Sequence, residues 1–168
     1  MHWGSSNVSN TIKVGISDQN IARAPDILVT FALGSCVGIC LYDSRIKLGG
    51  LSHILLPDSS AQSPLTTPYR FADSAIPLLL RRMESMGAKR AFIKAKIAGG
   101  AQMFAATNNA SLSHIGQRNV QAVRQALRSL GIPVIADDTG KNFGRTLYFH
   151  TDTGTMRIQS ATKGEWML

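Results

Sequence analysis

The sequence places a cysteine where it could act as a nucleophile. Cys36 follows Gly34 and Ser35 between two apolar segments, and a turn that glycine permits would present its sulfur at the start of a strand. The backbone N–H groups of such a turn can bind the oxyanion that forms during acyl transfer to cysteine. The simpler alternative is a buried cysteine that serves as a small apolar residue.

His53 favours the catalytic interpretation. If Asp43 to Ile46 form a hairpin turn, then Tyr42 pairs with Lys47, and Cys36 lies directly opposite His53. Opposed residues of an antiparallel pair have Cβ atoms about 4.5–5.5 Å apart, close enough for a thiol to bond an imidazole. A slip of one residue would move the two side chains to opposite faces, so the prediction depends on register. The alternative is a histidine satisfied within the core.

A third group must orient the imidazole. Thr30 lies in the segment before the glycine-serine turn, and its hydroxyl could accept the second ring N–H. Threonine is also an ordinary strand residue, which is the competing explanation. No carboxylate is expected in the strands beside the cysteine and the histidine, because the candidate aspartates fall at predicted strand ends. These are Asp26, Asp43 and Asp58.

The apolar pattern predicts a single mixed α/β domain. Residues 1–10 are expected to form a flexible tail and residues 11–168 the domain. Helical spacing predicts two amphipathic helices, and the shorter apolar runs predict strands joined largely as hairpins. The expected helices are 69–86 and 115–130, the expected strands are 11–16, 26–33, 36–42, 48–56, 90–98, 133–136, 147–150 and 155–159, and a polar loop is expected at 17–20. This combination predicts a sheet sandwich with helices packed on it.

Composition narrows the range of partners. The net charge of +8 favours an acidic partner. Nucleic acid is not expected, because the basic residues are scattered and lack aromatic interleaving. Membrane insertion is not expected either, since no apolar run approaches the roughly 20 residues of a spanning helix. The polar N-terminus does not resemble a secretion signal, so the cytoplasm is the expected compartment.

The two cysteines do not suggest a disulfide or a metal site. Cys36 and Cys40 lie four residues apart, which along a strand is roughly 13 Å at about 3.3 Å per residue. A disulfide needs Cα atoms closer than about 7 Å. A structural zinc site needs a second close pair of ligands. We therefore expect no metal and no cofactor.

Several motifs together resemble the CheD family of chemoreceptor glutamine deamidases. They occur in the family's order over roughly residues 12–158: the turn 34–36, Asp43, residues 49–57 with Ser52-His53, residues 96–101, Met103-Phe104, Ile115-Gly116 with Arg118-Asn119, and residues 138–140. Ala32 stands where a second glycine is expected before the cysteine, which affects the fine geometry of the turn. The resemblance implies a catalytic triad of Cys36, His53 and Thr30, and a fold similar to that of bacterial deamidating toxins.

The resemblance also implies partners and a reaction. The substrate would be the cytoplasmic helical domain of a chemoreceptor, deamidated through a cysteine thioester, with oxyanion support from the turn at Gly34 and Ser35. Methylesterase activity on the receptor is a possible side reaction of the same chemistry. The alternative is a non-catalytic regulator of a CheC-type phosphatase. Phe104 is a candidate docking residue for that phosphatase, or else a core anchor.

Overall fold

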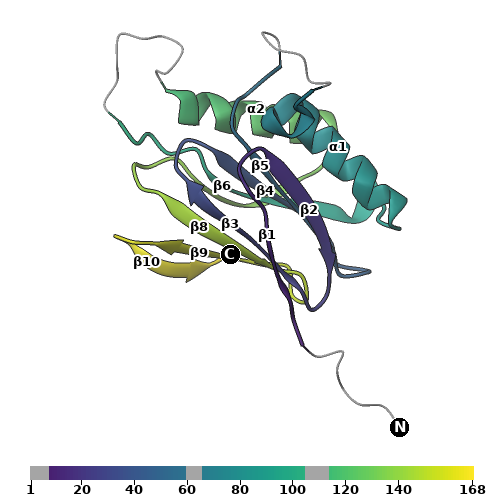
Figure 1. The fold of residues 1–168 in the computed structure, drawn as a ribbon. Coiled ribbons are helices and arrows are strands. Elements are labelled where there is room, and N and C mark those ends of the chain that lie inside the picture. The colour runs from purple at the N-terminus through teal and green to yellow at the C-terminus, as the bar shows by residue number, and fades with distance from the viewer. Residues whose placement is uncertain (1–7, 60–65, 105–113) are drawn as a thin grey trace.

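Two five-stranded sheets and two helices form three layers in the computed structural model, which describes residues 8–59, 66–104 and 114–168. Both helices cover one face of the central sheet, and the outer sheet covers its other face (Figure 1). The expected mixture of helices and sheets is therefore confirmed. Similarity to deamidating toxins stays an expectation.

The central sheet has the strand order β2-β5-β4-β6-β7. Its strands are β2 (Asp18–Arg23), β4 (Val37–Asp43), β5 (Leu48–Ile54), β6 (Ile93–Gly99) and β7 (Val134–Thr139). All neighbours are antiparallel except β6 and β7, which run parallel. The outer sheet has the order β1-β3-β8-β9-β10. Its strands are β1 (Thr11–Lys13), β3 (Ile27–Leu33), β8 (Arg145–His150), β9 (Thr155–Ser160) and β10 (Gly164–Met167).

Strand β4 shows how the two apolar cores are divided. Val37, Ile39 and Leu41 belong to the core under the helices, whereas Cys40 belongs to the core between the sheets. Alternate side chains of a strand point to opposite faces, so a strand covered on both sides must be apolar on both. Burying one large aliphatic side chain stabilises the fold by about 1.5–3 kcal/mol, which explains why this strand is apolar from Val37 to Leu41 and carries polar groups only at its C-terminal end, at Tyr42 and Asp43.

The helices are α1 (Ala72–Ser85) and α2 (Ile115–Ser129), with 3-10 turns at Pro68–Arg70 and Arg90–Phe92. Gly50 of β5 lets α1 approach closely, because a Cβ there would lie 2.9 Å from the side chains of Leu79 and Met83. Neither helix in the described ranges is long and apolar enough to cross a membrane.

The polar loop expected at 17–20 is wrong, because Asp18–Arg23 forms the edge strand β2. The first three residues of this strand are polar, so the apolar pattern did not indicate a strand. Gln19 points inward, but its amide donates to Ala75 O at 3.0 Å and its carbonyl oxygen accepts from Arg82, so a buried polar side chain is satisfied. Strand β10 was also missed; it is a short edge strand that is exposed at three of its four residues.

Candidate active site

Cys36 lies in the turn that leads from the outer sheet into β4. The β3–β8 ladder shifts register between Thr30 and Leu33, and Ala32 adopts the left-handed conformation with φ 60°. A glycine would adopt this conformation without strain. The family pattern is expected to have glycine at this position, so the alanine of this chain stands at a residue whose backbone conformation favours glycine. Cys36 is 7% exposed, which leaves its sulfur at the edge of the core.

The last residue of β6 and the two residues that follow it hold the nucleophile turn in place. Gly100 N–H donates to Cys36 O and Ala101 N–H donates to Gly34 O, both at 2.8 Å. Gly99 must be glycine, because its φ is +110° and a Cβ would lie 2.3 Å from Cys36 O. This role of Gly99 and Gly100 was not predicted from the sequence. The available signal was a glycine pair directly after a predicted strand.

His53 lies in β5, on the face turned toward the outer sheet. The predicted register is wrong by two residues: Gly38, not Cys36, pairs with His53, and the turn begins after Asp43. Asp43 remains in the strand because its carboxylate accepts the N–H groups of Arg45 and Lys89. A shift of two residues preserves the face, so Cys36 is the diagonal neighbour of His53 instead of its direct partner.

Thr30 and His53 meet across the layer between the sheets. Thr30 Oγ1 and His53 Nδ1 are 2.6 Å apart, and the same hydroxyl donates to Val14 O at 2.7 Å. A hydroxyl has one proton, and a carbonyl can only accept. The imidazole must therefore donate from Nδ1, which leaves the lone pair on Nε2. This is the tautomer that a general base needs.

The electrostatics of the site favour an uncharged resting pair. His53 Nε2 is buried and has no hydrogen-bond partner among the described residues, Cys36 included. Burial lowers the pKa of His53 to about 4. Burial also raises the pKa of the Cys36 thiol, an effect opposed in part by its own backbone N–H. At neutral pH the site therefore holds a thiol and a neutral imidazole.

One carboxylate does lie beside the histidine, contrary to expectation. Asp18 of β2 pairs with His53 across the β2–β5 ladder. The sequence analysis assigned it to a loop. Asp18 is exposed, and its neighbour Ser17 donates its backbone N–H to His53 O. Because Thr30 already occupies Nδ1, Asp18 is not the group that orients the ring.

Phe104 is exposed on the surface near the turn. Its exposed fraction is 84%, so the alternative of a core anchor is wrong. The preceding residue, Met103, packs on the nucleophile turn, with Cγ 3.1 Å from where a Cβ of Gly34 would lie. The predicted loop at 105–113 lies outside the described residues.

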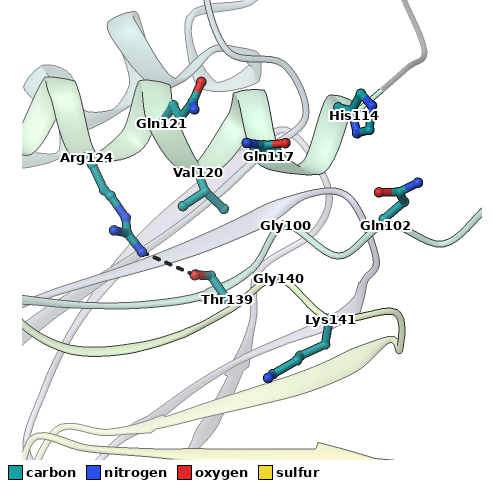
Figure 2. A pocket seen from close by; sticks show the side chains of 10 residues that line it. All are labelled: Gly100, Gln102, His114, Gln117, Val120, Gln121, Arg124, Thr139, Gly140 and Lys141. Atoms are coloured by element: carbon teal, nitrogen blue, oxygen red, sulfur yellow. Dashed lines mark hydrogen bonds between the residues drawn. The ribbon is translucent and has the colours of Figure 1, made fainter. Parts of the chain in front are cut away.

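A pocket of about 420 Å³ lies beside the segment at Gly100 that supports the turn. Figure 2 shows side chains of α2 on one wall and the segments after β6 and β7 on the other. Gly100 lines this pocket and also binds Cys36 O. No described lining residue is acidic; the lining comprises Gly100, Gln102, His114, Gln117, Val120, Gln121, Arg124, Thr139, Gly140 and Lys141. The pocket is therefore suited to neutral or acidic groups next to the site.

Comparison with known proteins identifies the family of the chain. The family model for CheD, described as chemotactic sensory transduction, matches residues 55–160. The chain is 49% identical over 153 residues to a protein of Clostridium novyi (strain NT) named probable chemoreceptor glutamine deamidase CheD. A protein of the same name from Clostridium botulinum (strain Kyoto) is also 49% identical. Each alignment covers 91% of this chain and 94% of the relative. This chain belongs to the CheD family.

Proposed function

We propose that this chain deamidates glutamine side chains of chemoreceptors, with Cys36 as nucleophile, His53 as general base and Thr30 as the group that orients His53. The observation that supports this most strongly is the hydrogen-bond chain from His53 Nδ1 through Thr30 to Val14 O. It fixes the imidazole with a bare Nε2 on the face that Cys36 shares. The substrate class comes from the names of the relatives.

The first half of the proposed reaction forms a thioester. The Cys36 sulfur attacks the carboxamide carbon of glutamine while its proton passes to His53 Nε2. The carbonyl oxygen becomes an oxyanion. The Gly34 N–H donates to Ala32 O, whereas the N–H groups of Ser35 and Cys36 donate to no other backbone group among the described residues, so we assign Ser35 and Cys36 as the oxyanion donors in place of Gly34. The C–N bond then breaks, and the proton on Nε2 leaves with the ammonia.

The second half returns the enzyme to its starting state. His53 Nε2 takes a proton from water, and the resulting hydroxide attacks the thioester carbon. The C–S bond breaks, glutamate is released, and the departing sulfur recovers the proton from Nε2. A neutral resting pair suits both halves, because one imidazole must accept a proton and then give it back. A methyl ester of glutamate would be cleaved by the same steps, which makes receptor methylesterase activity a secondary expectation.

The surface around Phe104 supports a second candidate function. A phenylalanine that is 84% exposed one residue from the segment covering the nucleophile turn is a suitable anchor for a protein partner. We propose a CheC-type phosphatase as that partner, bound close enough to the turn to compete with receptor substrate. A purely regulatory protein would use this surface and would not need the Thr30–His53 bond.

Intact-mass analysis of a receptor cytoplasmic fragment tests the proposed function. After incubation with the wild-type chain, the fragment should gain the mass difference between NH and oxygen for each deamidated glutamine. The same fragment with those glutamines changed to alanine is the matched control. No mass change with a receptor that carries candidate glutamines, while the chain still binds a CheC-type phosphatase, would favour the regulatory alternative.

A further inference from the structure

We infer that Asn119 is a positioning residue, whose side-chain amide holds the nucleophile turn at a fixed distance from the strand that carries the base. This inference rests on the proposed function. Asn119 lies on α2 and is completely buried, on the face that packs on the central sheet. A buried amide is costly unless it is hydrogen-bonded, so its bonding partners indicate what it does.

Both amide hydrogens of Asn119 are used, and their acceptors lie on the two segments that carry the proposed catalytic pair. Nδ2 donates to Ser35 O at 2.9 Å and to Leu55 O at 3.0 Å. Ser35 directly precedes Cys36, and Leu55 follows His53 by two residues. One planar group therefore sets the spacing between the nucleophile segment and the base segment.

The β4–β5 ladder ends where this bridge begins. Its last pair is Val37 with Ile54, so the next position would pair Cys36 with Leu55. The backbone groups there are engaged elsewhere, since Cys36 O accepts from Gly100 and Leu55 N–H donates to Arg70 O. The Asn119 amide thus takes the place of the missing ladder bonds at the level of the nucleophile.

Close approach of α2 to the turn makes this bridge stiff. Gly116 of α2 has no room for a side chain, because a Cβ would lie 2.4 Å from Ala101 O. A Cβ on Gly100 would likewise lie 2.2 Å from Val120. The segment held in this way is the one whose N–H groups bind Gly34 O and Cys36 O. Helix α2 therefore holds the turn directly through Asn119 and indirectly through the Gly100-Ala101 segment.

The donor character of Asn119 is what the site requires. Its Oδ1 is buried and has no hydrogen-bond partner among the described residues, so the side chain is retained for its NH₂ group at the cost of an unsatisfied oxygen. Aspartate has the same shape but would place a carboxylate against two carbonyl oxygens. Leucine has a similar volume and no donor. Either substitution should release the turn while leaving α2 in place.

The test measures thiol reactivity as well as turnover. In a Cys40→Ala background, the rate at which iodoacetamide alkylates Cys36 reports on the nucleophile without any receptor. We expect Asn119→Asp to slow alkylation at neutral pH by about tenfold, toward the rate of His53→Ala. We expect kcat to fall by about 100-fold with KM within about twofold, since a small misplacement has that effect on a reacting pair. Asn119→Leu gives the same comparison if the aspartate variant does not fold.

Val123→Ala is the matched control, because Val123 is a buried α2 residue of the core under the helices. It should lower the melting temperature and leave both rates unchanged. Wild-type rates in the Asn119 variants, with a loss of stability like that of Val123→Ala, would overturn the inference. If alkylation depends on Asn119 and His53 but no receptor fragment is deamidated, the positioning role stands and the proposed function fails.

Discussion

The two cysteines occupy the same apolar layer at two very different places. Cys36 and Cys40 both belong to the core between the sheets. Cys40 lies in the middle of β4, where it pairs with Leu51 on one side and Lys96 on the other, and burial raises the pKa of its thiol far above the ordinary range. Cys36 lies before the first residue of the strand, in a turn.

The difference shows that a cysteine at the end of a strand, where the hydrogen-bond ladder stops, is better placed to act as a nucleophile than one in mid-strand. In mid-strand the backbone groups are engaged by both neighbours, so no N–H remains for an oxyanion. At the strand entrance the N–H groups of Ser35 and Cys36 are not used by the sheet, and polar side chains can be buried because each finds a partner. Thr30 and His53 lie at this end of the layer, and Asn119 binds the turn from α2, on the other face of the central sheet.

The largest expected effect separates the two cysteines directly. Cys36→Ala should lower kcat/KM for receptor deamidation by more than about 1,000-fold, because the covalent step is lost. Cys40→Ala should retain activity. Both variants should show the wild-type circular dichroism spectrum. Comparable activity in wild type and Cys36→Ala would remove the distinction between the two sites and support the non-catalytic alternative.

The next effect distinguishes the roles of the two polar residues beside Cys36, His53 and Thr30. His53→Ala should be as inactive as Cys36→Ala, since the two act as a unit. Thr30→Ala and Thr30→Val should lose about 10- to 100-fold, the equivalent of one buried hydrogen bond of about 1–3 kcal/mol. Thr30→Ser keeps the hydroxyl and should recover most of this loss.

Steady-state kinetics on one receptor fragment measures all four variants. If the Thr30→Ala variant proves the most damaged while His53→Ala remains active, the assignment of base and orienting residue is wrong. A Thr30→Val variant with wild-type kcat would show that the imidazole does not depend on the bond to Thr30.

A smaller effect concerns the proposed binding of a CheC-type phosphatase at Phe104. Phe104→Ala should weaken binding of a CheC-type phosphatase by about 2 kcal/mol. The melting temperature should hardly change, because the ring is exposed and a buried phenylalanine would cost about 3–5 kcal/mol of stability. Calorimetric titration together with a melting curve measures both. Phe92→Ala is a matched control, since Phe92 is also exposed. Unchanged affinity in Phe104→Ala would rule out this docking surface.

The smallest expected effect is the change of activity with acid. The base form of His53 is neutral, and burial lowers its pKa from 6.5 to about 4. Protonation therefore removes activity only as the pH falls through that value. Activity should stay nearly constant between about pH 7 and about pH 5, whereas a histidine with an ordinary pKa would lose about 25-fold over that range. A kcat/KM profile with an acid limb near the ordinary value would contradict the burial of the base.

The sequence predicts most of the helices and strands and part of the candidate active site. Helical spacing identified α2 to within one residue at its C-terminal end, and the apolar runs identified β4 and β5. The face of His53 was predicted correctly although the register was not, because a shift of two residues preserves the face. Strand β2 was missed because one of its two buried residues, Gln19, is polar and is satisfied only by tertiary partners.

The contacts that make the site could not be read from the sequence. The Thr30–His53 bond crosses between two sheets, and nothing in strand periodicity determines how two sheets pack. The bridge from Asn119 joins residues separated by 84 and 64 positions. The Asn119 bridge follows from the packing of α2, in which a buried amide binds the nucleophile turn and Gly116 lies against the Gly100-Ala101 segment that supports this turn.

Trapping the proposed thioester tests the central claim most directly. The wild-type chain is mixed with a receptor cytoplasmic fragment, quenched in acid within one turnover, and digested for mass spectrometry. We expect a cross-link between Cys36 and a receptor glutamine position, with the mass of the two peptides less one ammonia, and no cross-link at Cys40. Conversion of glutamine to glutamate without any adduct on Cys36, retained in Cys36→Ala, would contradict the account.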